Sequence, residues 1–178
     1  MDIETRWMSD YNRKEARTAF SQPGIRYSQA ESLIKSLMQD DKFRDLSLVE
    51  RKKVTERILA EIKGRMMEDI VLLETKLSKK NCEVFRLQFA IGEFDMVVFG
   101  PEEETCEIYE INHSDKIVLQ QCRHLLDKQK CEDTAFRYRT IIGKYVIYRG
   151  ATTFLVQAGV STQEDVAYLN VEEYLKKL

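Results

Sequence analysis

The hydrophobic pattern of the chain changes its period at Lys79-Lys80-Asn81, and this change constrains the fold more than any other sequence feature. Before it, apolar residues recur every three or four positions, which is typical of an amphipathic helix. After it, they alternate at every second position, which is typical of strands. The chain has 178 residues, which fits one domain with a core of its own. We therefore expect a soluble α/β domain.

Two helices are predicted before the change of period. Ser28 and Ser47 are each followed three residues later by a glutamate, Glu31 or Glu50, which is the pattern of a capping box. The second helix carries the longest apolar stripe of the chain, made of Val54, Ile58, Ile62, Met66, Ile70, Leu73 and Leu77. We expect this stripe to be buried.

The start of the chain has a weaker pattern than the rest of the sequence. Residues 1–27 have weak periodicity and contain Gln22-Pro23-Gly24, a turn or linker signal. We expect them to form a flexible or loosely docked arm. The domain itself is then predicted over residues 28–178, with a helical lead-in over residues 28–80.

Strands are predicted for much of the second half of the chain. Three of them, over residues 84–89, 94–99 and 106–111, are separated only by Gly92 and by the turn at 100–104, so they should form an antiparallel meander. Further along, the pattern predicts a helix over about 116–128, a buried strand over 141–148, short strands near 154–156 and 166–169, and a helix over 171–178.

Composition excludes several classes of protein. The formal net charge is −2, which excludes a wholly basic nucleic-acid coat but leaves room for a local basic face. The four cysteines form no CxxC pair, and we interpret them as reduced structural thiols of a cytoplasmic protein. The sequence contains neither a Gly-rich phosphate loop nor an apolar run long enough to span a bilayer, and from its charged first residues we expect no signal peptide.

An acidic hairpin holds the strongest candidates for chemistry. From Glu93 to Ser114 there are seven acids and neither Lys nor Arg. Asp95 lies inside an apolar run, where an unpaired carboxylate is costly to bury. Glu110 raises the same question one strand later, and a hairpin can bring the two together. Such a pair suits Mg²⁺ or Mn²⁺; the alternative is a pair of inward acids held by hydrogen bonds or by Lys and Arg.

The motif Gly92-Glu93-Phe94-Asp95, a hairpin, and Glu110-Ile111-Asn112-His113-Ser114 together resemble the PD-(D/E)XK nuclease-like core. More closely, the chain from about Gln22 onward resembles the C-terminal domain of a group of bacterial AAA-type ATPases. The resemblance implies a three-layer, restriction-endonuclease-type core: a helix, a three-strand antiparallel meander, a helix and a strand. It also implies an ATPase domain or subunit and DNA as partners.

Carried over by position, the resemblance makes Asp95 and Glu110 the metal ligands. Glu68 matches an additional acid on the preceding helix, with Glu74 as a competing candidate and an ion pair to Arg65 as the alternative for Glu68.

The third motif position departs from the family, because Asn112 stands where a lysine is expected. Asparagine has no positive charge and cannot act as a base. Loss of one preorganised donor commonly lowers a rate by about 10²–10³. Lys116 is the candidate replacement and His113 a weaker one, whereas an inactive, degenerate site is the alternative.

A basic segment comes after the acidic hairpin. From Asp115 to Arg149 there are eight Lys and Arg residues against four acids, a local charge of 8 − 4 = +4. The predicted nucleic-acid contacts are Arg123, Lys128, Lys130, Arg137 and Arg139. Tyr138, Tyr145 and Tyr148 lie among the eight basic residues of the segment, which suits phosphate contacts combined with base stacking. An ordinary solvated helix and strand edge is the alternative interpretation.

These observations point to two functions. The first is a Mg²⁺- or Mn²⁺-dependent phosphodiesterase acting on DNA, active or weakened by Asn112. The second is a non-catalytic nucleic-acid or protein-interaction module of an ATPase assembly.

Overall fold

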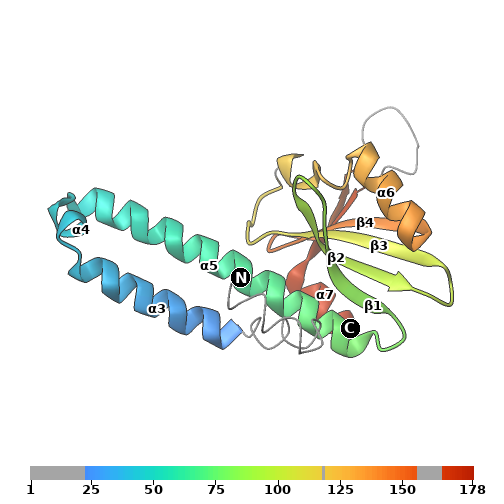
Figure 1. Ribbon diagram of the computed structural model, residues 1–178, viewed down its shortest axis with the longest axis horizontal. Coiled ribbons are helices and arrows are strands. Elements are labelled where there is room, and N and C mark those ends of the chain that lie inside the picture. The colour runs from blue at the N-terminus through green and yellow to red at the C-terminus, as the bar shows by residue number, and fades with distance from the viewer. Residues whose placement is uncertain (1–22, 118, 156–165) are drawn as a thin grey trace, which may run out of the picture. The chain divides into compact units, whose positions relative to one another are not determined.

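The computed structural model describes residues 23–117, 119–155 and 166–178. The chain divides into two compact units between Asp69 and Ile70. Helices make up the described part of the first unit, whereas the second is built around one sheet (Figure 1). Most of the predicted N-terminal arm lies outside the described residues.

Three helices begin in the described part of the first unit: α3 (Pro23–Gln39), α4 (Asp41–Asp45) and α5 (Leu48–Ser78), the last of which continues into the second unit. The capping box predicted at Ser47 is confirmed. The Ser47 N–H donates to Glu50 Oε2 at 2.9 Å, and the Glu50 N–H donates to Ser47 Oγ at 3.3 Å. These two bonds satisfy backbone donors that the first turn of α5 leaves without helical partners.

The predicted start of the first helix at Ser28 is wrong, because α3 begins five residues earlier at Pro23. Proline has no N–H to leave unsatisfied in a first turn, and its fixed φ suits the first helical position. Ser28 therefore lies inside α3 rather than at its N-cap.

The C-terminal end of α5 buries a different face from the one that the apolar stripe predicts. Val71 and Thr75 are completely buried, whereas Ile70 is 36% and Leu77 60% exposed. The Thr75 hydroxyl donates to the Val71 carbonyl at 2.7 Å and is hydrogen-bonded to the Tyr174 hydroxyl at 2.9 Å. These bonds make a polar side chain tolerable on the buried face.

The second unit contains a mixed six-stranded sheet in the order β1-β2-β3-β4-β6-β5. The meander is confirmed, since β1, β2 and β3 pair in antiparallel fashion. β4 pairs parallel with β3 and with β6, and β5 closes the edge in antiparallel pairing with β6. The strands are β1 (Glu83–Gln88), β2 (Glu93–Gly100), β3 (Thr105–Ile111), β4 (Thr140–Tyr148), β5 (Thr153–Leu155) and β6 (Val166–Asn170).

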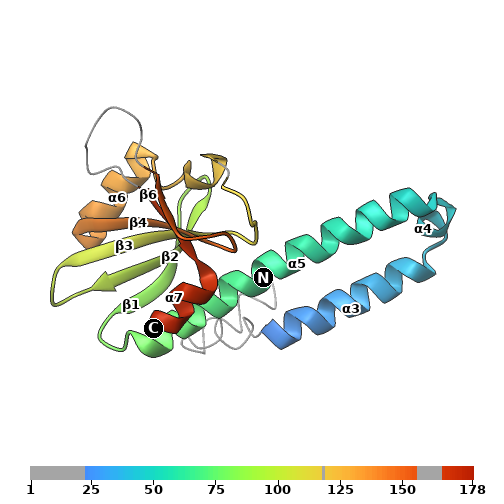
Figure 2. The same ribbon diagram turned by 180° about the vertical axis from the view of Figure 1, so that it is seen from behind.

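Helices cover both faces of the sheet (Figures 1 and 2). Helix α6 (Lys128–Tyr138) packs on β3 and β4, and α7 (Val171–Lys177) packs on β4 and β6. On the α6 face, Cys106 and Ile108 of β3 belong to the main hydrophobic core, against which Tyr138 of α6 packs. On the α7 face, Tyr109 of β3 meets Tyr174 with ring centroids 6.0 Å apart. Successive β3 residues thus point to opposite layers.

The helix predicted over residues 116–128 is wrong. That stretch contains only a short 3₁₀ helix among its described residues, η1 (Leu119–Cys122), followed by turns, and α6 begins where the predicted helix ends. Asp127 is the N-cap of α6, and its Oδ1 accepts a 3.2 Å bond from the Lys130 N–H. The cap fixes the start of a helix whose Lys-Gln-Lys-Cys-Glu-Asp opening lacks an evident apolar stripe.

Candidate functional site

The hairpin between β1 and β2 is irregular at the aspartate that the sequence singles out. The register shifts between Phe85 and Leu87, so that Asp95 and Met96 together lie opposite Arg86. Two residues facing one is a β-bulge, which bends its strand and redirects a side chain. The bulge lies near the start of β2, next to Glu110, the candidate partner of Asp95 on β3.

Asp95 and Glu110 lie opposite one another at the end of the β2–β3 ladder. The last pair of that ladder joins Met96 to Tyr109, and the same antiparallel register reaches Asp95 and Glu110 one step later. The Ile111 N–H donates to Asp95 Oδ2 at 2.7 Å. The two carboxyl groups are hydrogen-bonded to each other, which requires a proton between them.

Burial and mutual repulsion make this pair hold its proton at neutral pH. Burial first, and then the charge of Asp95, raises the pKa of Glu110 to about 9. Burial also raises the pKa of Asp95, although the Ile111 N–H favours its charged form. Because that N–H bonds to Asp95, we infer that Asp95 is ionised and Glu110 carries the proton.

Glu110 Oε1 is buried and has no hydrogen-bond partner among the described residues. A buried acceptor without a donor is costly, and a hydrated divalent cation would satisfy it. Mg²⁺ suits this donor set, because proteins hold it with one or two carboxylates and several waters. Residues 23–117, 119–155 and 166–178 include no group of three His, Cys, Asp or Glu side chains arranged for a metal. An ion here would therefore be held by Asp95, Glu110, water and substrate.

Lys130 is a member of this site that sequence reasoning placed elsewhere. It is 8% exposed instead of lying on a solvated face. Its Nζ lies 2.7 Å from His124 Nδ1 and 5.2 Å from the centre of the Phe89 ring. Its charge opposes the upward shift in the pKa of Glu110. The structure places Lys130 in the first turn of α6, after the N-cap Asp127 and four residues before Thr134, which is also buried.

The other residues near the motif have local tasks or remain exposed. Asn112 Oδ1 accepts a 3.0 Å bond from the Ser114 N–H, which turns the chain after β3. Lys116 lies in an exposed loop, not one turn into a helix, and its N–H donates to Ser114 Oγ at 3.0 Å. His113 is half-buried. Lys116 thus lacks the helical support on which its predicted role rested.

The two helical acids differ in their surroundings. Glu68 belongs to the first compact unit, where its Oε2 lies 3.8 Å from Arg65 Nη1, the ion pair considered as the alternative to metal binding. Glu74 is exposed on α5. A metal-ligand role for either residue stays a prediction.

Two of the predicted nucleic-acid contacts form ion pairs with acids of the fold, and two others are exposed. Lys128 lies 3.8 Å from Glu132, and Arg139 lies 3.6 Å from Glu104. Arg123 and Arg137 are exposed. Such exposed ion pairs contribute little to stability and can exchange for phosphate contacts.

The three tyrosines of the basic segment do not form a common stacking surface. Tyr138 packs against Phe85 and Phe99. Tyr148 is buried and donates to the Ala151 carbonyl. Tyr145 is stacked on Tyr109, on the opposite face of the sheet from Tyr148. The rings of these tyrosines pack within the fold instead of forming one surface for bases. The sequence alone could not predict this, because the charges around them do not report how the rings pack.

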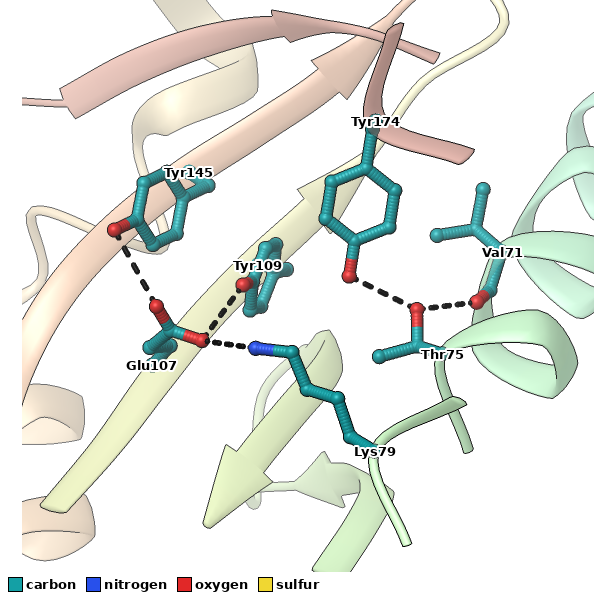
Figure 3. Close-up of polar contacts among 7 residues, drawn as sticks. All are labelled: Val71, Thr75, Lys79, Glu107, Tyr109, Tyr145 and Tyr174. Carbon is teal, nitrogen blue, oxygen red and sulfur yellow. Dashed lines mark hydrogen bonds and ion pairs between the residues drawn. The ribbon is translucent and has the colours of Figure 1, made fainter. Parts of the chain in front are cut away.

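A second polar cluster lies on the α7 face and was missed by sequence reasoning (Figure 3). Glu107 Oε2 accepts from Lys79 Nζ at 3.0 Å and from the Tyr109 hydroxyl at 2.9 Å, while its Oε1 accepts from Tyr145 at 3.5 Å. Burial lowers the pKa of Lys79, but the bond and the charge of Glu107 outweigh it and leave that pKa raised. All the polar groups here are paired within the fold, so the cluster acts structurally, fastening the end of α5 to β3.

Comparison with protein-family models and with curated protein sequences finds no match to this chain. Among the described residues, none of the helices combines the length and the apolar character needed to cross a bilayer.

Proposed function

We propose that the second unit is a PD-(D/E)XK nuclease-like domain with a restriction-endonuclease-type core, which binds Mg²⁺ or Mn²⁺ and acts on DNA. One observation carries this proposal. Asp95 and Glu110 are hydrogen-bonded carboxyl groups at the bulged end of a hairpin, and a buried Glu110 oxygen lacks a partner among the described residues. Asp95 has a backbone donor, the Ile111 N–H, but the second oxygen of Glu110 has none, whereas the buried oxygens of structural acids are normally all paired.

The proposed chemistry assigns separate roles to the residues present. Asp95 and Glu110 would hold the ion, and Glu110 would give up its proton when it does so. A bound ion supplies an activated water and neutralises phosphate charge. Lys130, the cation that acts on Glu110, would provide the positive charge that Asn112 cannot. Its ammonium would stabilise charge that develops on the phosphate oxygens during attack.

A second candidate function uses the same fold without catalysis. Asn112 replaces the motif lysine, and its side chain is engaged in the turn after β3. Lys116 lies in an exposed loop. These two observations favour a nucleic-acid or protein-interaction module within an AAA-type ATPase assembly. In that case the carboxyl pair would be a remnant without turnover.

Plasmid cleavage with Mn²⁺ or Mg²⁺ separates the two candidates. The wild-type chain, Glu110→Ala and Asn112→Lys are compared at equal concentration, with Glu102→Gln as a control from the exposed turn of the same hairpin. We expect wild-type cleavage that Glu110→Ala abolishes and Glu102→Gln retains. Cleavage only by Asn112→Lys would identify a decayed site. Cleavage that survives Glu110→Ala would overturn the assignment, and no cleavage by any variant would favour the non-catalytic module.

A further inference from the structure

Lys130 has an unusual environment for a buried cation. Among the described residues no carboxylate lies within 4.0 Å of its ammonium group, although lysines are seldom buried unless they are paired. The polar contact of its Nζ is His124 Nδ1 at 2.7 Å, and the face of Phe89 provides a cation–π contact at 5.2 Å. A buried ammonium group whose close polar contact is an imidazole instead of a carboxylate is costly to desolvate, so its burial points to a role besides stability.

The turn between β1 and β2 leaves room for this contact because residue 92 is a glycine. Gly92 has a φ of +77°, and a Cβ there would lie 2.9 Å from His124 Cε1 and 3.0 Å from Lys130 Nζ. The residue after Gly92 is Glu93, the first residue of β2, two positions before Asp95. The ammonium group is therefore held against the end of the strand that carries the candidate metal ligand.

We propose that His124 is a positioning residue for Lys130, holding its ammonium group against the turn that leads into β2, the strand of Asp95, by accepting a hydrogen bond at Nδ1. The inference rests on the proposed function, because it concerns the reaction proposed for that pair. A lysine side chain has four rotatable bonds and would otherwise sample many positions. The ring of His124 fixes one of them before substrate arrives, and such preorganisation is what makes a charged group effective in a transition state.

Acceptance at Nδ1 requires the imidazole to carry its proton on Nε2. Asparagine places its Oδ1 near the position of Nδ1, so His124→Asn keeps an acceptor for Lys130. Glutamine places its Oε1 near the position of Nε2 instead of Nδ1, and leucine has no acceptor, so both remove the acceptor for Lys130. These three substitutions separate the hydrogen bond from the volume of the side chain.

The first experiment tests how Lys130 is held by measuring its chemical reactivity, and it requires neither a bound metal nor enzymatic activity. Reductive methylation of the full chain with formaldehyde is followed by mass spectrometry, with the exposed Lys128 of the same helix as the internal reference. We expect Lys130 to react more slowly than Lys128 in the wild type. His124→Leu and His124→Gln should accelerate the reaction of Lys130 about tenfold, as loss of one hydrogen bond to a charged group predicts, and His124→Asn should not.

The second experiment reads the consequence for the reaction. In Mn²⁺-dependent plasmid cleavage, His124→Leu should lower kcat by up to about 10²–10³-fold, the range for loss of a preorganised donor, with KM for DNA unchanged. His124→Asn should restore most of kcat, and Lys130→Met should resemble His124→Leu.

The outcomes distinguish this inference from the proposed function. A wild-type chain that cleaves DNA, with His124→Leu equally active, overturns the positioning role alone. Methylation of Lys130 that is unaffected by His124→Leu also overturns it. A wild-type chain that neither binds Mn²⁺ nor cleaves DNA overturns the proposed function, and the positioning role with it, whatever the methylation rates.

Discussion

The carboxyl group of Asp95 is hydrogen-bonded to that of Glu110 across the end of β2 and β3, with the Ile111 N–H donating to Asp95 at 2.7 Å. Two acids in this position cannot both be charged without strong repulsion, so they retain one proton. The same geometry that makes the pair costly in the absence of a cation makes it a suitable set of oxygen ligands for one.

The pair makes stability depend on pH in a defined direction. The pKa of Glu110 is about 9 in the folded chain against an ordinary value of 4.5. Between these values the folded state keeps a proton that the unfolded state releases, so stability falls as pH rises through this window. Glu110→Gln cannot ionise, so it removes this loss of stability at high pH. In urea denaturation with a chelator present, we expect this variant to be more stable than wild type at about pH 8, by at least about 1 kcal/mol, and equal to it near about pH 4.

Glu102→Gln serves as the control for this prediction, because it removes one acid from the exposed turn of the same hairpin. Its stability should follow the wild-type curve across the whole range. If the free energy of unfolding of wild type and of Glu110→Gln changed in parallel with pH, the pKa of Glu110 would not be raised in the folded chain, which would contradict the prediction.

The Glu107 cluster should contribute to stability rather than to activity. Lys79 Nζ and the Tyr109 hydroxyl both donate to the same oxygen of Glu107 (Figure 3). Glu107→Ala leaves both donors without their acceptor and should lower the free energy of unfolding by about 1–3 kcal/mol. Tyr145→Phe should change it by less than about 0.5 kcal/mol, since its 3.5 Å bond is long. Urea denaturation of the two variants measures both effects, and equal losses would contradict this division.

Arg139 adopts a backbone conformation that favours glycine, with φ at +66° and ψ at −143° at the end of α6. Such strain costs about 1–3 kcal/mol, and the exposed ion pair with Glu104 offsets little of it. Arg139→Gly should therefore raise the midpoint of thermal unfolding, whereas Arg139→Ala, which keeps a Cβ, should not. A lower midpoint for the glycine variant would show that the contacts of the arginine side chain outweigh the strain.

Much of the sheet could be predicted from the sequence, because alternation over residues 106–111 and short apolar runs such as 94–99 and 141–148 are typical of strands. The bulge opposite Arg86 could not, since Asp95 is followed by a continuous apolar run, residues 96–99, in which an extra residue disturbs no visible alternation. The position of α6 was missed because its burial is carried by Lys130 and Thr134, whose residue types predict exposure.

Some residues of the candidate site could also be predicted from the sequence, whereas others could not. Asp95 and Glu110 could be found because acids within apolar strands are conspicuous, and the structure brings their side chains together. Lys130 and His124 could not be placed, because their contact depends on the turns after η1 and on the close approach of Gly92. The charge pattern predicted Lys130 as a nucleic-acid contact, whereas the side chain is buried in the first turn of α6, which the Asp127 cap begins.

Binding of Mn²⁺ to the full chain, measured by electron paramagnetic resonance, tests the central proposal most directly. The wild type, Asp95→Asn, Glu110→Gln and the exposed-turn control Glu102→Gln are titrated under the same conditions. The account predicts one site in the wild type and in Glu102→Gln, weakened at least about tenfold by either substitution in the pair. A wild-type chain without a Mn²⁺ site, or an affinity that Glu110→Gln leaves unchanged, would contradict it.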